Sequence, residues 1–249
     1  MIKEQIINSI FYPRKHHFQD EKDILINVNN DKIAIRLFLK NSGFPTILFF
    51  HGNAEICKDY DEIADMYNNF NINLIVSDYR GYGHSTGKPS KDNLHKDSIT
   101  VFDYTLNHLK KNKYINKLIV MGRSLGSASA SHLMKNRIDL IDGCIIESGF
   151  ANEYPLLKLM NIKPEDIAFK LTDGFNNLEK IKSFSKPLLI IHAELDDIVP
   201  YNQAEIIYQE SKSTQKEIFK VKNANHNNII MVSQTVYFEK IKSFIDSLQ

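Results

Sequence analysis

The fold is decided by a stretch in the middle of the chain, Lys117-Leu118-Ile119-Val120-Met121-Gly122-Arg123-Ser124-Leu125-Gly126. A short apolar run ends in the pattern Gly-x-Ser-x-Gly, and a helical pattern follows directly at 128–133. This order is typical of a nucleophile elbow, in which a strand ends, the chain turns sharply, and flanking glycines let a strained serine stand clear before a helix. The stretch therefore predicts Ser124 as a nucleophile. The alternative is a plain Gly-Ser turn in which Ser124 only caps the helix.

Short apolar runs alternate with helical patterns on both sides of this stretch. The runs typical of buried strands are 46–50, 73–77, 117–121, 143–147, 187–192 and 217–221. The helical patterns are 60–70, 93–111, 125–136, 202–211 and 232–248. Before them, runs 24–28 and 33–39 flank the turn signal Asn29-Asn30-Asp31, which indicates an antiparallel hairpin. We therefore expect an α/β fold, with a mostly parallel sheet of about eight strands, an N-terminal antiparallel hairpin and helices on both faces.

No repeat or linker divides the sequence, so we expect one domain over 1–249. One interval, 148–185, breaks the alternation, because its short apolar clusters are interrupted by Pro155, Pro164 and Gly174. It is too long for a plain connection and too short for a domain. The interval predicts a small cap above the sheet, and the alternative is one ordinary crossover helix with a long loop.

The composition excludes several classes of protein. With 31 Lys+Arg against 30 Asp+Glu the net charge is +1, which gives no electrostatic footprint for a nucleic acid, and 43% hydrophobic residues exclude a disordered chain. Two distant cysteines, Cys57 and Cys144, are expected to be free thiols. The longest apolar runs are about five residues, far below the roughly 20 that span a bilayer, and the N-terminus holds no signal-peptide core. We expect a soluble, cytoplasmic protein without a transmembrane segment; the oligomeric state stays open.

A serine hydroxyl is a weak nucleophile near neutral pH and needs a base. Of the nine histidines, His226 alone follows the strands of the second half, in the polar loop 222–228 between the last predicted strand and the last helix. An imidazole in such a loop can reach over the nucleophile, so His226 is the predicted base. The alternative is a loop histidine that only faces solvent. His51 precedes the nucleophile in the chain, and we expect it to hydrogen-bond within its own loop.

An acid should orient the imidazole and stabilise its charged form. Three carboxylates follow the predicted strand 187–192, and Asp196 is preferred over Asp197 and Glu194. The alternative is that these carboxylates cap the helix that starts near residue 202.

An oxyanion hole requires two backbone N–H groups. Leu125 supplies one, because it follows the nucleophile at the start of a helix. The loop after strand 46–50 supplies the other, and Gly52 lets it turn so that the Asn53 N–H is the expected donor. A glycine-rich loop at 77–87 carries an Asp78/Arg80 pair but no phosphate-binding motif, so we interpret it as a structural wall.

Five segments in this order resemble the α/β-hydrolase superfamily, most closely the small-cap branch with Bem46-like proteins and protein depalmitoylases. The segments are His51-Gly52-Asn53-Ala54-Glu55, Asp78-Tyr79-Arg80-Gly81-Tyr82-Gly83, Gly122-Arg123-Ser124-Leu125-Gly126, His192 to Pro200 and Ala224-Asn225-His226-Asn227. The resemblance implies the α/β-hydrolase fold, Ser124 as nucleophile, Asp196 as acid and His226 as base, with Asn53 and Leu125 as oxyanion donors. The family's usual His-Gly-x-x-Asp reads His192-Ala193-Glu194-Leu195-Asp196 here, and a turn shifted by one residue would make Asp197 the acid.

The resemblance also implies hydrolysis of a carboxylic ester or thioester without a metal or organic cofactor. We therefore expect a serine hydrolase that forms an acyl-enzyme on a small-molecule or lipid-like acyl ester. The apolar residues expected to form an acyl pocket are Tyr154, Leu156, Leu157, Met160, Ile198 and Val199, and burial in the core is the alternative for several of them. One alternative is a serine peptidase or amidase on the same fold. Another is a catalytically silent binding protein.

Overall fold

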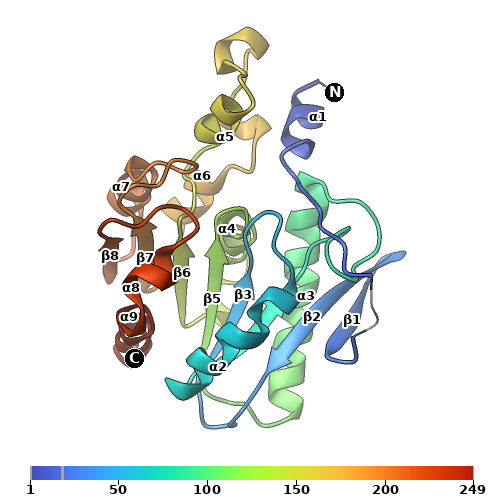
Figure 1. Cartoon of the computed structure of the whole chain (residues 1–249), viewed down its shortest axis with the longest axis vertical. Coiled ribbons are helices and arrows are strands. Elements are labelled where there is room, and N and C mark those ends of the chain that lie inside the picture. The colour runs from blue at the N-terminus through green and yellow to red at the C-terminus, as the bar shows by residue number, and fades with distance from the viewer. Residues whose placement is uncertain (1, 18–19, 249) are drawn as a thin grey trace.

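The computed structural model describes residues 2–17 and 20–248, so Met1 and Gln249, the ends of the predicted domain, lie outside the described residues. In the described part of the chain, eight strands form one sheet in the order β1-β2-β4-β3-β5-β6-β7-β8 (Figure 1). The strands are β1 (Asp23–Val28), β2 (Asp31–Phe38), β3 (Thr46–Phe50), β4 (Asn73–Ser77), β5 (Leu118–Arg123), β6 (Gly143–Glu147), β7 (Leu188–Ala193) and β8 (Lys216–Val221). The pairs β1–β2 and β2–β4 are antiparallel, and every later pair is parallel. This confirms the predicted sheet and its N-terminal hairpin.

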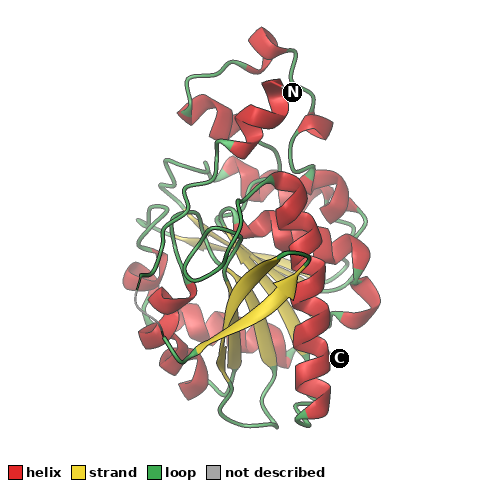
Figure 2. Ribbon diagram, turned by 90° about the vertical axis from the view of Figure 1, so that its right-hand side faces the viewer, coloured by secondary structure: helices red, strands yellow, loops and turns green. Residues whose placement is uncertain are grey.

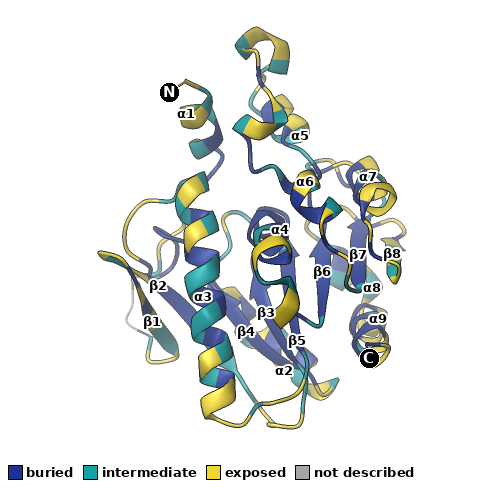
Figure 3. Cartoon of the chain, turned by 180° about the vertical axis from the view of Figure 1, so that it is seen from behind, coloured by how far each residue is buried: buried dark blue, intermediate teal, exposed yellow. Residues whose placement is uncertain are grey.

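Helices cover both faces of the sheet. They are α1 (Ile2–Asn8), α2 (Asp61–Asn69), α3 (Lys91–Lys111), α4 (Gly126–Asn136), α5 (Tyr154–Leu159), α6 (Asn177–Lys182), α7 (Asn202–Glu210), α8 (Ile229–Ser233) and α9 (Thr235–Asp246), with 3-10 turns η1 (Cys57–Tyr60), η2 (Ile138–Leu140), η3 (Pro164–Ile167) and η4 (Leu171–Asp173). Helices α2 and α9 lie in front of the sheet in Figure 1, and α3 and α4 lie behind it, where Figure 3 shows them.

The central strands are buried because each face meets its own layer of helices. In β3, Ile47 and Phe49 join the apolar cluster under α2 and α9, whereas Leu48 and Phe50 join the cluster under α3 and α4. Side chains along a strand point alternately to opposite faces, so a continuous apolar run suits this position. Figure 3 shows the result as a dark sheet between partly exposed helices.

Two segments rise beyond the carboxyl ends of the strands, as Figures 1 and 2 show. The interval 148–185 contains α5, η3, η4 and α6, short helical segments in place of one crossover helix. Beside it stands α1, which the sequence patterns did not predict. The ammonium group of Lys3 on α1 donates to the Asp173 carboxylate at 2.8 Å, and therefore ties the two segments together.

Two further observations concern predictions from composition. Cys57 and Cys144 are both buried free thiols, as expected. Among the residues that the structure describes, no helix is both long enough and apolar enough to span a bilayer. The cytoplasmic location stays a prediction.

The register of the parallel strands sets the place of the functional loops. Phe50 at the end of β3 pairs with Ser77 of β4 on one side and with Gly122 of β5 on the other. The loops that follow these three strands therefore start at the same edge. Ligands of open parallel sheets bind at this edge, beyond the carboxyl ends of the strands.

Candidate active site

Ser124 occupies a strained turn between β5 and α4. Its φ is +49°, in the left-handed region that non-glycine residues seldom adopt, and its N–H donates to the Glu147 carbonyl at 2.9 Å. The flanking glycines are required because a methyl group at Gly126 would overlap the Phe50 carbonyl, and one at Gly122 would overlap the backbone of Gly126. This is the backbone geometry expected of a nucleophile elbow.

His226 lies between Ser124 and Asp196. Its Nε2 is 3.0 Å from Ser124 Oγ, and its Nδ1 is 2.8 Å from Asp196 Oδ2 and 2.9 Å from Oδ1. A carboxylate only accepts hydrogen bonds, so Nδ1 carries the proton and Nε2 keeps the lone pair that accepts from the Ser124 hydroxyl. The structure thus brings together three predicted residues that are far apart in sequence, and all three are buried.

Asp196 is held by the backbone of its own loop, after β7. The N–H groups of Ile198 and Val199 donate to Oδ1 at 3.1 and 2.7 Å. Burial alone would raise the pKa of Asp196, but the hydrogen bond from His226, the charge that His226 carries when protonated, and the Val199 N–H outweigh burial and lower it. The carboxyl group is therefore ionised at neutral pH, as the orientation of an imidazole requires.

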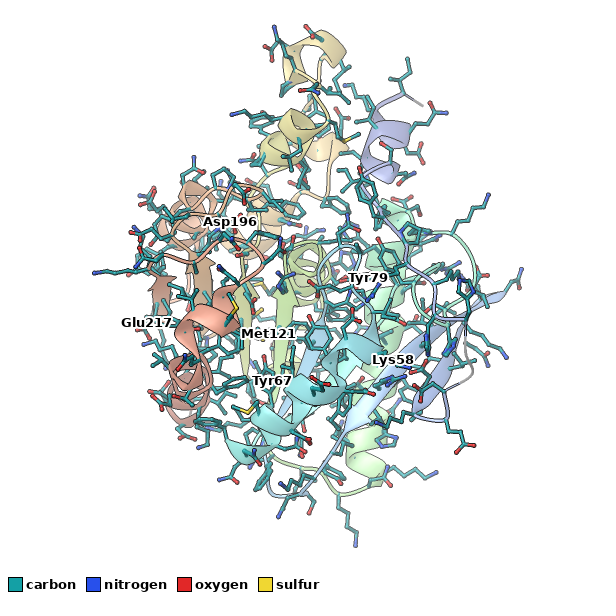
Figure 4. All side chains as sticks on the ribbon, viewed as in Figure 1. Lys58, Tyr67, Tyr79, Met121, Asp196 and Glu217 are labelled. Carbon is teal, nitrogen blue, oxygen red and sulfur yellow. The ribbon has the colours of Figure 1, made fainter. Side chains whose placement is uncertain are left out.

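The other two carboxylates of this loop point elsewhere. Asp197 is exposed, and Glu194 accepts from the Asn223 N–H at 3.2 Å. Among the residues that the structure describes, Asp196 is the carboxylate in contact with His226, so the replacement of glycine by Ala193 does not shift the turn by one residue. Figure 4 labels Asp196 at the end of β7, on the edge where the candidate site lies.

The predicted oxyanion donors, Asn53 and Leu125, line the same hollow as Ser124. Over the described ranges, neither backbone N–H has a hydrogen-bond acceptor within the protein. The Asn53 side chain fixes its loop, because Nδ2 donates to the Ile10 carbonyl at 2.7 Å and Oδ1 accepts from the Tyr12 N–H at 2.9 Å. Both N–H groups are thus free to donate to a bound oxygen atom.

A hollow of about 410 Å³ opens beside Ser124. Its apolar lining residues are Ile10, Ala54, Leu125, Phe150, Leu156, Leu159, Met160 and Ile198. Leu156, Met160 and Ile198 agree with the predicted acyl pocket. The prediction was wrong for three residues. Leu157 and Val199 are buried in the core, and Tyr154 is 44% exposed and packs against Phe169. Ile10, Ala54, Phe150 and Leu159 were missed.

The glycine-rich loop at 77–87 has a structural role. Asp78 accepts from His51 Nε2 at 3.0 Å, and Arg80 donates to both carboxylate oxygens of Asp97 at 2.7 and 2.8 Å. Arg80 Nη1 also donates to Asp31 at 2.6 Å. These ion pairs already neutralise the Asp78/Arg80 pair, so the loop is a wall and not a phosphate site.

One residue of the site was missed although it stands inside the decisive motif. Arg123 directs its guanidinium at two carboxylates, Glu55 and Glu147, and at the backbone carbonyl of His226. The sequence does contain a signal for it, because a charged residue is unusual at the end of an otherwise apolar strand, directly beside a predicted nucleophile. Its partners were not predictable, because they come from distant parts of the chain.

Comparison with known proteins adds an independent line of evidence. The family model Hydrolase_4, described as "Serine aminopeptidase, S33", matches residues 44–170. That range includes β3, the nucleophile turn and the start of the interval beyond β6.

Two curated relatives and one solved structure illustrate the similarity. Protein bem46 of Schizosaccharomyces pombe is 30% identical over 94% of this chain and 79% of its own length. The lysophosphatidylserine lipase ABHD12 of Rattus norvegicus is 30% identical over 67% of this chain, which spans 45% of that protein. The esterase Pf2001 of Pyrococcus furiosus has a TM-score of 0.75 at 19% identity, covering 96% of this chain and 98% of the esterase.

Proposed function

Because this chain belongs to the α/β-hydrolase family, we propose that it is a serine hydrolase that cleaves a carboxylic ester or thioester through an acyl-enzyme. One observation carries the proposal. A continuous chain of hydrogen bonds runs from Ser124 Oγ through His226 to the ionised Asp196. A serine, a histidine and a carboxylate so connected form the arrangement that activates a hydroxyl for attack on a carbonyl.

The reaction proceeds in two halves. His226 Nε2 takes the Ser124 proton as Oγ attacks the carbonyl carbon, and the same nitrogen then protonates the leaving alcohol or thiol. Water, deprotonated by His226, attacks the acyl carbonyl carbon; the acyl–Oγ bond then breaks, His226 returns the proton to Ser124 Oγ, and the acid is released. Asp196 holds the imidazole in one tautomer and stabilises its charged form in both halves.

Negative charge develops on the carbonyl oxygen in each half of the reaction. The Asn53 and Leu125 N–H groups receive it in our proposal, and the start of α4 behind Leu125 adds the positive end of a helix dipole. Loss of one such donor usually lowers kcat by about 10²–10³-fold.

The proposed substrate carries an apolar acyl chain. The hollow beside Ser124 is lined mainly by aliphatic and aromatic side chains, and its charged members are Arg123 and, when protonated, His226. Each methylene group buried there contributes about 0.8 kcal/mol. We expect kcat/KM for p-nitrophenyl esters to rise up to about fourfold per added methylene, until the chain fills the hollow. The ABHD12 relative, a lysophosphatidylserine lipase by name, supports a lipid-like ester.

A second candidate function is hydrolysis of a peptide from its amino terminus, which the description of the matching family model favours. An aminopeptidase must bind a free α-ammonium group, for which a carboxylate is the natural partner. Among the described residues that line the hollow, none is an aspartate or glutamate. The lining therefore favours an ester substrate over an amino-terminal peptide.

The test compares purified wild-type protein with Ser124→Ala on p-nitrophenyl esters of graded chain length, acyl thioesters and aminoacyl-amides. We expect ester or thioester turnover and labelling by a fluorophosphonate in the wild type only. Turnover that persists in folded Ser124→Ala would refute the proposal. Failure of well-folded wild type to label would favour a silent binding protein, and faster cleavage of aminoacyl-amides than of esters would favour the peptidase.

A further inference from the structure

The candidate site is formed by the loops that follow β3, β5, β7 and β8, and one side chain at the end of β5 bonds the loops that follow β3 and β8. Arg123, the residue before Ser124, ends β5 and is largely buried, with 13% of its side chain exposed. Its Nη2 donates to the His226 carbonyl at 2.7 Å and lies 3.4 Å from Asn227 Oδ1. Arg123 thus bonds the backbone of the very residue that we propose as the base.

The opposite edge of the guanidinium bonds the loop after β3. Arg123 Nη1 forms an ion pair with Glu55 Oε1, and the other oxygen of Glu55 accepts from the Gly52 N–H at 2.9 Å. Gly52 directly precedes Asn53, one of the proposed oxyanion donors. A Cβ at Gly52 would overlap both the guanidinium and the Glu55 carboxylate, so the ion pair would have to shift to admit any other residue. The ion pair therefore packs against the backbone of the oxyanion loop.

Two further contacts fix the guanidinium in place. Its Nε lies 3.2 Å from Glu147 Oε1 at the end of β6, and Glu147 Oε2 accepts from the Tyr237 hydroxyl at 2.5 Å. Glu55 Oε2 also accepts from the Tyr60 hydroxyl at 2.6 Å. A planar guanidinium held by several partners at once has little freedom to rotate, in contrast to a lysine ammonium.

We propose that Arg123, through Glu55 and the His226 carbonyl, is the positioning residue that sets the base and the oxyanion loop relative to Ser124. This inference rests on the proposed serine hydrolase function. Arg123 does not touch the reacting atoms, because its N–H groups are directed at Glu55, Glu147 and His226. Arg123 acts by holding His226 and the oxyanion loop in position, and a displacement of about 1 Å in a catalytic group lowers the rate by roughly 10²-fold.

The structure also suggests how the guanidinium group could be replaced in a variant that lacks the Arg123 side chain. A second hollow of about 390 Å³ lies behind the site, and Arg123, Glu147, Tyr60 and Tyr237 are among the residues that line it. Removal of the Arg123 side chain would leave two carboxylates and a carbonyl facing a space that is open to small solutes. A free guanidinium ion has the charge and the planar donors to occupy it.

The experiment measures inactivation by an alkyl fluorophosphonate, which separates the binding constant KI from the rate constant kinact. For Arg123→Ala we expect kinact to fall about 10²-fold with KI unchanged, and guanidinium chloride, below the concentrations that unfold the protein, to restore part of kinact. Arg123→Lys should retain an intermediate kinact, because an ammonium cannot bond both loops. Glu55→Gln should also lower kinact, and it serves as the second variant if Arg123→Ala does not fold.

The matched control is Arg36→Ala. Arg36 is an even more deeply buried arginine, with 1% of its side chain exposed, and its ion-pair partners Asp20, Asp23 and Asp61 all lie outside the candidate site. We expect this variant to lose stability and keep its kinact, with no response to guanidinium. A folded Arg123→Ala that reacts at the wild-type rate would overturn the positioning role, and so would a change confined to KI. Neither result bears on the proposed function, which in this experiment would fail if wild-type protein did not react with the fluorophosphonate.

Discussion

Among the residues that the structure describes, two buried histidine–aspartate pairs joined by a hydrogen bond lie at the same edge of the sheet, and their difference shows what makes a histidine a base. His226 meets Asp196 at 2.8 Å, and His51 meets Asp78 at 3.0 Å. Burial and the distance to the carboxylate are therefore almost the same in the two pairs. The second ring nitrogen differs: in His226 it faces a hydroxyl group, and in His51 it faces a backbone carbonyl.

The partner of that second nitrogen determines the protonation of the ring. His51 Nδ1 is 2.7 Å from the Gly52 carbonyl, which can only accept, and Asp78 on the other side also accepts. Both nitrogens of His51 therefore carry protons. Burial lowers the pKa of His51, but the hydrogen bond and charge of Asp78 outweigh it, so the pKa is raised. A doubly protonated imidazole has no lone pair to accept the proton of a serine.

The largest expected effect separates the two histidines by activity. His226→Ala removes the proposed base and should lower kcat for a p-nitrophenyl ester by about 10⁶-fold, as the loss of a triad histidine does elsewhere. His51→Gln should leave kcat of the folded protein near the wild-type value. Steady-state kinetics, normalised to the folded fraction by circular dichroism, provide the measurement. A comparable loss in both variants would show that the comparison is wrong.

The next effect tests which aspartate orients the base. Asp196→Asn should lower kcat by about 10⁴-fold, because an amide can donate to the ring and stabilise the wrong tautomer. Asp197→Asn is the matched control, since Asp197 is the exposed neighbour, and it should change kcat little. The same ester assay decides between them. A larger loss in Asp197→Asn would reassign the acid to that residue.

The sequence contains enough information for the strands and for the order of the site residues. The bounds of β3, β4 and β6 agree with the predicted runs 46–50, 73–77 and 143–147, because strands buried on both faces leave continuous apolar runs. Helix α3 begins two residues earlier than predicted, at Lys91, because the Ser90 hydroxyl caps it by accepting from the Asn93 N–H at 3.1 Å.

Side-chain direction and long-range partners could not be predicted in the same way. Helix α5 has only six residues, so its periodicity could not show that Leu156 faces the hollow and Leu157 the core. Arg123 and Glu55 are 68 residues apart, and their ion pair has no local spacing that a pattern can reveal. Such pairs become visible only when the register of the sheet is known.

A smaller expected effect concerns the contribution of the His51–Asp78 pair to stability. His51→Ala leaves the buried Asp78 carboxylate without its cation, and a buried pair broken on one side costs about 3–5 kcal/mol. We expect the free energy of unfolding in urea to fall by about that amount. His17→Ala, a change at an exposed histidine, is the control and should leave it unchanged. Equal stability of the two variants would mean that the His51–Asp78 pair is not a structural ion pair.

The smallest effect is the pH dependence of that contribution. The pKa of His51 is raised above its ordinary value of 6.5 in the folded protein, so the folded state binds the proton more tightly than the unfolded state. The stabilisation is complete below pH 6.5 and is lost as the pH rises through the folded pKa, by at most about 1.4 kcal/mol for each unit of the rise. The difference in free energy of unfolding between wild type and His51→Gln, measured in urea from pH 6 to pH 9, should therefore shrink with increasing pH. Other titrating groups occur in both proteins and cancel in this difference. If the difference in free energy of unfolding stays constant or grows over this range, His51 is not charged. Only its lack of access to Ser124 would then distinguish His51 from His226.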